Sequence, residues 1–472
     1  MNDHYLTDSQ PHLVRSPWDQ TIVGETSLAG PAGMSRAAET IVNSAARAAA
    51  EPAHIRAERL DAVASAIEAQ SATIAALIRM EAGKPITLAK AEAGRAVSLF
   101  RAAAAWCRRD VAGDVLAMES LPQGDGHRGY SRRFPIGPTL AITPFNFPLN
   151  LVAHKIAPAV AVGATLIVKP SPRTPLSALW LQDRLREAGI PEEQVLVLPA
   201  GPEALEPLFD DDRIRLITFT GSAKVGWDLR QRCPQKRVTL ELGGTAPLLV
   251  CRDAEWESLM PKIVASAFGY AGQTCISLQH LYVDREVMPA FREAFIEATR
   301  HVVTGDPLSN DTICGPMITK EAADHVQATV QDAVDSGAQV RVPLERTAPT
   351  VLKPAILDGV PEGHRLSREE IFGPVALMHE VADWREAVQR MNQSPYGIHA
   401  GVLTRDIHIA HHLFEQLETG GVLINEVPTF RTDNMPYGGV KQSGLGREGI
   451  PAACEDMTEV RTLLLRLEEP GL

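Results

Sequence analysis

The chain has 472 residues, which is enough for two or three domains with sizeable hydrophobic cores. Its formal net charge is −12 and no basic tract offsets it, which argues against a nucleic-acid partner. The six cysteines include no C-x-x-C pair, which excludes a zinc ribbon and a small disulfide scaffold and is typical of a reducing compartment. We expect no metal site.

Nothing in the chain predicts export or a membrane span. Residues 1–15 contain no apolar core and no Arg-rich amphipathic face, so we expect no targeting peptide. The longest apolar run, 156–168, contains a proline and a glycine and is too short to cross a bilayer. We therefore expect a cytoplasmic protein without a membrane partner.

The first third of the chain is predicted to be mainly helical, because apolar residues recur there at helical spacing. The predicted helices are 35–50, 54–80 and about 88–109, and Gly83 ends the second of them. Two extended segments, 113–122 and 128–135, flank a Gln-Gly-Asp-Gly sequence that is typical of a hairpin.

From residue 139, short strands alternate with helices. The predicted strands are 139–143, 165–169, 195–198, 215–219 and 237–242, and the predicted helices are 148–162, 175–188, 202–209 and 222–232. This alternation predicts a doubly wound parallel sheet, which binds ligands at the carboxyl ends of its strands.

A second alternating unit begins after Gly244. It is predicted to contain a strand at 248–250 and helices at 254–270, 286–300, 319–336 and 383–392. The glycine-dense segment 436–449 is predicted to be an ordered loop, and 458–467 a strand. The fold class is therefore α/β, with two doubly wound parallel-sheet units.

Two segments carry the candidate chemistry. Residues 238–244 read as a strand that delivers the carboxylate of Glu241 and stops at two glycines, and 268–275 is a Gly-rich loop that presents Cys275. Thiolate attack on a carbonyl compound leads to a thioester, and a carboxylate can activate water to hydrolyse it. Taken alone, however, a lone cysteine is more often a small buried residue, and a strand-end glutamate is usually a solvated charge.

The sequences of both segments closely resemble the two active-site signatures of the aldehyde dehydrogenase superfamily, and their separation along the chain also suits that family. The resemblance implies that Cys275 is the nucleophile and Glu241 the general base for deacylation. Residues 143–148 resemble the oxyanion loop of the family. There the Asn146 amide and the Cys275 backbone N–H would stabilise the tetrahedral alkoxide.

The resemblance also implies a nicotinamide cofactor, NAD or NADP. The residues it assigns to cofactor binding are Phe145, Lys169 for the adenosine ribose, Gly221 and Ser222 for the pyrophosphate, and Glu370 and Phe372 for the nicotinamide end. The family often has a glutamate that binds the 2′-hydroxyl where this chain has Pro172. Because Arg173 can meet a 2′-phosphate, we expect relaxed cofactor choice.

The fold that the resemblance implies has a dinucleotide-binding domain, a catalytic domain and a β oligomerisation arm. The corresponding ranges are 1–112 and 137–243 for the first, 244–443 for the second, and 113–136 and 444–472 for the arm. We expect a homo-oligomer, either a dimer or a tetramer.

The segment 424–439 is similar to the branch with lactaldehyde, phosphonoacetaldehyde and non-phosphorylating glyceraldehyde-3-phosphate dehydrogenases. Arg95, His154 and Arg431 match its cationic substrate pocket, although Thr274 stands where phosphonoacetaldehyde enzymes have arginine. We expect a small aldehyde with a phosphonate, phosphate, sulfonate or carboxylate group. A lactaldehyde or succinate-semialdehyde-type dehydrogenase is the alternative.

Three other classes compete with this interpretation. CoA-acylating relatives commonly lack the base, so Glu241 argues against them. A cysteine hydrolase would need a histidine oriented toward Cys275, and no His-centred motif stands out. A non-catalytic binding protein with an inherited fold would be supported by loss of the Cys, Glu or Asn, and all three are present.

Overall fold

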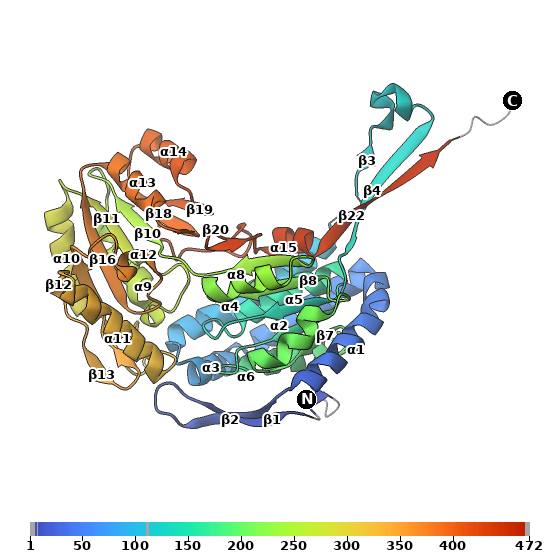
Figure 1. The fold of residues 1–472 in the computed structure, drawn as a ribbon, viewed down its shortest axis with the longest axis horizontal. Helices are drawn as coiled ribbons and strands as arrows, with labels where there is room; N and C mark the ends of the chain where they lie inside the picture. Colours follow the sequence, from blue (N-terminus) through green and yellow to red (C-terminus); the bar gives the residue numbers. More distant parts are fainter. Residues whose placement is uncertain (1–4, 7, 110–112, 468–472) are drawn as a thin grey trace.

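The computed structural model describes residues 5–6, 8–109 and 113–467. The predicted domain limits at residues 1, 112 and 472 lie outside these residues. Two large sheets, each covered by helices, form two lobes, and a small sheet projects from the first lobe as an arm (Figure 1). No helix in the described part of the chain is long and apolar enough to span a membrane.

The first lobe is built on a six-stranded sheet in the order β21-β9-β8-β5-β6-β7, parallel except for β21. Its strands are β5 Thr139–Ile142, β6 Leu166–Lys169, β7 Val195–Val197, β8 Leu216–Thr220, β9 Arg237–Glu241 and β21 Gly444–Leu445. β5, β6 and β7 are buried at every residue, as expected of parallel strands covered on both faces. All five strands predicted for this region are confirmed.

The helices of the first lobe are α1 Pro31–Ala50, α2 Ala53–Ala69, α3 Ser71–Ala82, α4 Ile86–Cys107, α5 Asn150–Val162, α6 Leu176–Glu187, α7 Glu206–Asp210, α8 Ala223–Arg232 and α15 Ile450–Asp456. The prediction of one helix over 54–80 was wrong. The helix is interrupted at Gln70, which has φ −114° and ψ 21°. Both α2 and α3 bury apolar residues, so the apolar spacing continues across the interruption and gave no sign of it. Gly83 ends α3 in the left-handed conformation, as predicted. The predicted helix 202–209 begins as a 3₁₀ turn, Pro202–Leu205.

The second lobe contains a seven-stranded sheet in the order β12-β15-β16-β11-β10-β18-β19, in which only the β12–β15 pair is antiparallel. Its strands are β10 Pro247–Val250, β11 His280–Asp284, β12 Gln339–Val342, β15 Ala355–Asp358, β16 Val375–Val381, β18 His399–Leu403 and β19 Gly421–Ile424. Its helices are α9 Met260–Phe268, α10 Met288–Arg300, α11 Lys320–Asp335, α12 Arg365–Arg368, α13 Trp384–Asn392 and α14 Ile407–Gln416. The predicted helix 254–270 is therefore shorter, since 3₁₀ turns at Glu257–Leu259 and Gly269–Gly272 flank α9.

The arm is a three-stranded antiparallel sheet in which β4 lies between β22 and β3. Its strands are β3 Val115–Leu116, β4 His127–Pro135 and β22 Thr458–Arg466. The predicted strand 113–122 is reduced to β3, because 3₁₀ turns at Met118–Ser120 and Pro122–Gly124 occupy most of the rest. β21 and α15 lie against the first lobe, so within the segment 444–467 only β22 extends into the arm.

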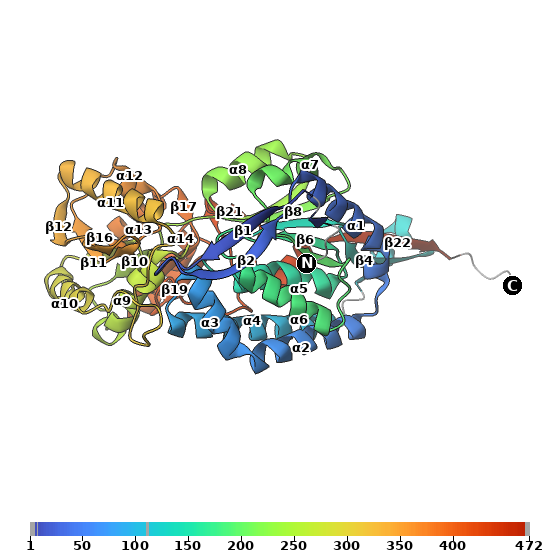
Figure 2. The ribbon, with the colours of Figure 1, turned by 90° about the horizontal axis from the view of Figure 1, so that it is seen from below.

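A hairpin that the sequence analysis did not predict joins the lobes. Its strands are β1 Gln10–Arg15 and β2 Ile22–Leu28, and it lies on the side of the molecule that faces the viewer in Figure 2. Its tip reaches the second lobe, where Thr350 Oγ1 donates a hydrogen bond to the Pro17 carbonyl at 2.8 Å. The remaining short strands are β13 Arg346–Ala348, β14 Val351–Leu352, β17 Tyr396–Gly397 and β20 Val440–Lys441.

Candidate active site

A cavity of about 760 Å³ lies between the two lobes. The first lobe contributes residues at the carboxyl ends of its strands, namely Asn146 after β5, Gly221 after β8 and Glu241 at the end of β9. The second lobe contributes Cys275 and Glu370, which precede β11 and β16. The fold thus brings the carboxyl edge of one sheet to the amino edge of the other.

The loop before Cys275 has an unusual backbone. Tyr270 and Ala271 both have φ of 53°, a left-handed conformation that is costly for residues with a Cβ. The side chain of Gln273 holds this turn: its Nε2 donates to the carbonyls of Tyr270 and Pro316 at 3.2 and 3.1 Å, and its Oε1 accepts from Ile318 N at 2.8 Å. The turn presents Cys275 to the cavity.

Cys275 is partly exposed, and its Sγ lies 2.8 Å from the Tyr437 hydroxyl. Burial of the sulfur atom raises the pKa of the thiol to about 12, while the Tyr437 hydrogen bond lowers it. The carboxyls of Glu370 and Glu241 also raise this pKa, and the charge of Arg431 opposes them. The local groups that favour the thiolate are therefore Tyr437 and Arg431.

Glu241 ends β9 and is only 3% exposed. Within the described residues, neither of its carboxyl oxygens has a hydrogen-bond partner. Burial raises the pKa of this carboxyl well above 4.5, and the charge of Glu448 raises it further, against the opposing charges of Lys155 and Arg431. A carboxyl with free oxygens and a raised pKa has the properties of a general base for a water molecule.

Glu448, which is close enough to Glu241 to raise its pKa, forms two buried ion pairs. Lys155 Nζ is 2.8 Å from Glu448 Oε1, and Arg431 Nη2 is 3.2 Å from Glu448 Oε2. Burial opposes ionisation of Glu448, but the charges of Lys155 and Arg431 outweigh it and hold the pKa of Glu448 well below its usual range. Glu448 is thus the ionised member of the buried Glu241–Glu448 pair.

Asn146 lies in the loop after β5, and its amide reaches the nucleophile loop. Its Nδ2 donates to the Gln273 carbonyl at 3.0 Å, and its Oδ1 is buried without a partner among the described residues. An amide group carries two N–H donors, so one remains for an oxyanion beside Cys275. The geometry satisfies the requirement for an oxyanion donor near the nucleophile.

The same two loops are joined by a buried ammonium group. Lys84 Nζ lies 3.5 Å from the centroid of the Phe147 ring, next to Asn146, and 4.9 Å from that of Tyr270. Lys84 also forms a buried ion pair with Glu92, which accepts hydrogen bonds from two backbone N–H groups at the start of α5. Burial lowers the pKa of Lys84 to about 8.

The residues predicted to bind a dinucleotide surround the same cavity, with one exception. Gly221 and Ser222 precede α8, and the Phe145 and Phe372 rings meet edge to face with centroids 6.0 Å apart. A Cβ on Gly243 would collide with the Glu370 carboxylate, so this glycine leaves the room that Glu370 occupies. These residues fit a dinucleotide that enters along the carboxyl edge of the first sheet.

Glu370 is placed by residues that the sequence analysis did not single out. Its Oε1 accepts a hydrogen bond from Gly244 N at 3.2 Å, and burial raises its pKa to about 8. The Gln279 amide donates to the Leu366 and Glu369 carbonyls at 3.1 and 2.9 Å and accepts from Ile371 N at 3.1 Å. Gln279 therefore fixes the loop that carries Glu370.

Lys169 is the exception among these residues. It ends β6, is 7% exposed, and does not line the cavity. Burial lowers the pKa of its ammonium group to about 8, against the charge of Glu203.

Arg95, His154 and Arg431, predicted to form an anion pocket, converge around two carboxylates. Arg95 Nη2 and His154 Nε2 lie 2.8 and 3.2 Å from Asp433 Oδ1, and Arg431 Nη2 lies 3.4 Å from His154 Nε2. Arg95 and Arg431 line the cavity, whereas His154 is 2% exposed and does not. Burial and the Arg431 charge lower the pKa of His154, so its ring is neutral.

A sequence model described as the aldehyde dehydrogenase family matches residues 5–463. The chain belongs to the aldehyde dehydrogenase family. It is 36% identical to the 3-sulfolactaldehyde dehydrogenase of Priestia aryabhattai over 83% of this chain and 82% of that protein.

Solved structures agree with this assignment. Aldehyde dehydrogenase 21 from Physcomitrella patens, in complex with the reaction product succinate, superposes with a TM-score of 0.94 at 35% identity and covers 98% of this chain and 96% of its own. The glyceraldehyde-3-phosphate dehydrogenase GapN from Methanocaldococcus jannaschii, complexed with NADP, gives a TM-score of 0.91 at 32% identity over 96% and 99% of the two chains.

These findings confirm the predicted family, the α/β fold class, the enzyme class, and NAD or NADP as cofactor. The chain is thus an NAD(P)-dependent aldehyde dehydrogenase. The roles of individual residues remain predictions that the geometry accommodates. Lys84, Tyr437 and Glu448 line the cavity but carried no recognised sequence signal, and neither did Lys155, which pairs with Glu448. Tyr437 and Glu448 lie in the glycine-dense segment 436–449, which was the one available indication.

Proposed function

We propose that this aldehyde dehydrogenase oxidises a small aldehyde bearing a phosphonate, phosphate, sulfonate or carboxylate group. The supporting observation is that one cavity is lined by Cys275, Asn146 and Glu241 together with two arginines, Arg95 and Arg431. The first three residues have the chemistry of aldehyde oxidation, and the arginines have the chemistry of anion recognition.

The proposed reaction assigns one task to each of three residues. The Cys275 thiolate attacks the aldehyde carbon, a C–S bond forms, and the carbonyl electron pair moves to an oxygen held by an Asn146 N–H. After oxidation to the thioester, Glu241 accepts a proton from water while the water oxygen attacks the thioester carbon. The C–S bond then breaks, the carboxylic acid leaves, and the thiolate is restored.

A bound oxidised nicotinamide would supply the acceptor for the hydride of the thiohemiacetal carbon. We propose that Gly221 and Ser222 receive the pyrophosphate at the start of α8 and that Glu370 holds the nicotinamide ribose. Phe145 and Phe372 would flank the ring, and Lys169 would bind the adenosine ribose from the end of β6.

The charge balance of the cluster supports an anionic substrate. Three fixed cations, Arg95, Lys155 and Arg431, face the ionised carboxylates of Asp433 and Glu448. His154 is neutral, so one positive charge is left over while the Glu241 carboxyl is protonated, the form that its raised pKa favours. An anionic group on the substrate neutralises this charge in a largely buried place, where electrostatic interactions are strong.

The relatives point in the same direction. Their names include a sulfolactaldehyde and a glyceraldehyde phosphate, and one was solved with succinate. A sulfonate, a phosphate and a carboxylate share the negative oxygens that an arginine fork binds in pairs. An enzyme for lactaldehyde or for a succinate-semialdehyde-type substrate is the second candidate. Lactaldehyde is neutral, so the panel below separates it from the proposed class, and comparison among the anionic members of the panel tests the succinate-semialdehyde type.

The test is a panel of short aldehydes, with and without an anionic group, assayed with NAD⁺ and NADP⁺ by nicotinamide absorbance. Arg95→Ala should raise KM for the preferred anionic aldehyde about tenfold or more, because a charge-assisted hydrogen bond is lost. Its matched control is Arg101→Ala, on the same helix but paired with Glu68 and half exposed. Equal effects of Arg95→Ala on propanal, or a wild-type preference for propanal or lactaldehyde, would contradict the anion pocket.

We also propose that the arm joins copies of this chain into a dimer or tetramer. β22 exposes Val460, Leu463, Leu464 and Leu465, an apolar row on a strand that projects from the body (Figure 1). Such rows mark association surfaces. Light scattering on the intact chain and on Leu463→Asp should show loss of the oligomer in the variant; a monomeric wild type would refute the proposal.

A further inference from the structure

Tyr437 contacts the reacting sulfur directly. Its hydroxyl lies 2.8 Å from Cys275 Sγ, and the residue is only 4% exposed although it lines the cavity. The backbone on both sides is fixed, because Tyr437 N donates to the Glu448 carbonyl at 3.0 Å and Glu448 N donates back to the Tyr437 carbonyl at 2.6 Å. The hydroxyl is therefore held at the sulfur by the same segment that supplies Glu448.

The Tyr437 ring is also immobilised. The Arg431 guanidinium lies over it, with Cζ 3.8 Å from the ring centroid, and the His399 ring meets it edge to face at 5.1 Å. His399 is held in turn by its Nδ1, 2.9 Å from the Pro428 carbonyl. A cation over the ring withdraws electron density from it, which makes the phenolic O–H a better donor. Packing therefore fixes the position of the Tyr437 hydroxyl, and the Arg431 charge strengthens the hydrogen bond that it can donate.

We propose that Tyr437 is a further catalytic residue of this enzyme, whose hydroxyl donates a hydrogen bond to the Cys275 thiolate and so stabilises the attacking form of the nucleophile. The proposal rests on the assignment of Cys275 as nucleophile within the proposed function. In this role the tyrosine keeps its own proton throughout, and the thiol proton passes to water in the cavity. The same hydrogen bond serves again when the thiolate leaves the thioester.

The surroundings of Cys275 show why such a donor matters. Burial is the largest influence against a thiolate at Cys275, and the nearby carboxyls of Glu370 and Glu241 oppose it further when they are ionised. Among the main influences on the thiol, those of Tyr437 and Arg431 favour the charged form. Burial also raises the pKa of Tyr437 well above 10, so at neutral pH the phenol carries the hydrogen that a thiolate needs.

The test is the pH dependence of Cys275 alkylation by iodoacetamide, followed by mass spectrometry of the Cys275 peptide. The other five cysteines are buried, so the reagent selects this thiol. Tyr437→Phe keeps the ring and removes only the donor. We expect the midpoint of the alkylation profile to rise by about one pH unit or more, and the rate below that midpoint to fall about tenfold or more.

Tyr282→Phe is the matched control, because it removes a buried hydroxyl from the second lobe, where the ring stacks on His379. Its profile should equal that of the wild type. Alkylation needs no aldehyde, so a raised midpoint in Tyr437→Phe supports the inference even if the aldehyde panel shows no preference for an anion. An unchanged midpoint overturns it even if the panel does show one.

Discussion

The two large sheets have similar architecture but use opposite edges. In the first sheet the cavity residues Asn146 and Glu241 follow or end strands, so the carboxyl edge carries the proposed chemistry, as is usual for parallel sheets. In the second sheet Cys275 and Glu370 precede their strands, so the amino edge carries it. At the carboxyl edge of the second sheet, the ends of β10, β11 and β16 contribute no residue to the cavity.

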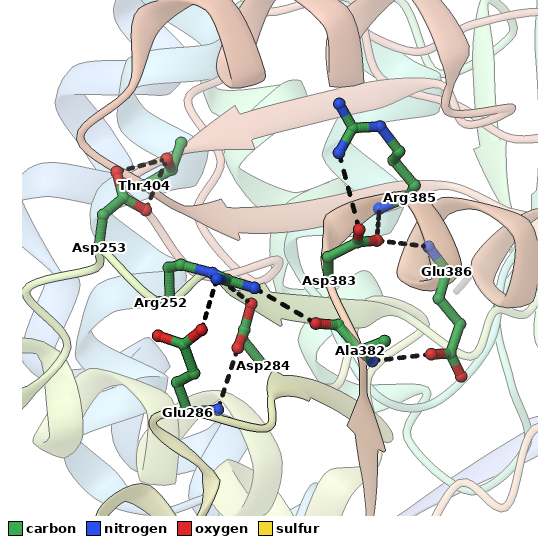
Figure 3. Close-up of polar contacts among 9 residues, drawn as sticks. All are labelled: Arg252, Asp253, Asp284, Glu286, Ala382, Asp383, Arg385, Glu386 and Thr404. Carbon is green, nitrogen blue, oxygen red and sulfur yellow. Dashed lines mark hydrogen bonds and ion pairs between the residues drawn. The ribbon is translucent and has the colours of Figure 1, made fainter.

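Figure 3 shows what occupies that carboxyl edge. Arg252, just after β10, contacts Asp284 Oδ2 at 3.1 Å and donates to the Ala382 carbonyl at 3.3 Å. Both oxygens of Asp253 accept from Thr404 Oγ1 at 3.0 Å, and Asp383 caps α13. The polar groups at these strand ends are paired with one another, and the loops are tied together.

In the part of the chain that the structure describes, the carboxyl edge of the first sheet keeps buried polar groups without partners, whereas the strand ends in Figure 3 do not. Within the described residues, Glu241 has two buried oxygens without a hydrogen bond and Asn146 has one. Each such group costs about 1–3 kcal/mol of stability, so it persists where function requires it. At the opposite edge the carboxylates of Asp253 and Asp284 have partners and contribute to structure.

The largest expected effect is that of removing the nucleophile at the amino edge of the second sheet. Cys275→Ala should lower aldehyde oxidation by on the order of 10³-fold or more, because no thioester can form. Cofactor binding, followed by fluorescence, should be retained. Substantial residual turnover would show that the amino edge does not supply the nucleophile.

The carboxyl edge of the first sheet is tested by Glu241→Gln. We expect thioester hydrolysis to slow by about 10²–10⁴-fold, while acylation still gives a burst of reduced cofactor. Rapid-quench measurement separates the two steps. If the variant loses both the burst of reduced cofactor and steady-state turnover, Glu241 must act before hydrolysis.

The same glutamate predicts a pH dependence. Its pKa is raised by burial and by Glu448, so the carboxyl stays protonated above 4.5 and becomes a base only at higher pH. Steady-state turnover should therefore rise with pH through the raised pKa and fall as pH decreases. Glu241→Gln should lose this limb of the profile, and a limb that persists in the variant would belong to another group.

A smaller effect is expected from Arg173, which follows β6 at the carboxyl edge of the first sheet and is exposed. Arg173→Ala should raise KM for NADP⁺ by roughly tenfold if a charge-assisted contact to the 2′-phosphate is lost, and should leave KM for NAD⁺ unchanged. Initial rates with both cofactors give the answer. A wild-type preference for NAD⁺ of many thousandfold would place cofactor discrimination elsewhere.

The smallest kinetic effect is expected at the carboxyl edge of the second sheet, where the polar side chains pair with one another. Arg252→Met leaves the buried Asp284 carboxylate without its ion-pair partner, so we expect a loss of about 1 kcal/mol and a melting temperature lower by about 2–4 °C. Kinetic constants should not change. Arg385→Met, which removes an exposed pair with Asp383, is the control and should be neutral. Altered kcat or KM in Arg252→Met would break the contrast between the edges.

Much of the first lobe was predictable because its strands are short apolar runs between helices, as in Leu166–Lys169. The second lobe was less so. β11 begins with a histidine and ends with an aspartate, and β18 contains a glycine, so neither reads as a strand until neighbours cover it. The hairpin Gln10–Leu28 was missed for a related reason: it is largely exposed and gains its place by contact with both lobes.

The sequence by itself determined which residues we expect to react, because Cys275, Glu241 and Asn146 each lie in a recognisable local sequence motif. Only the tertiary structure decided how they behave. Cys275 meets Tyr437 across 162 positions of sequence, and Lys155 meets Glu448 across 293. Protonation and reactivity depend on burial and on the charges within a few ångströms. Those neighbours exist only once the carboxyl edge of one sheet faces the amino edge of the other.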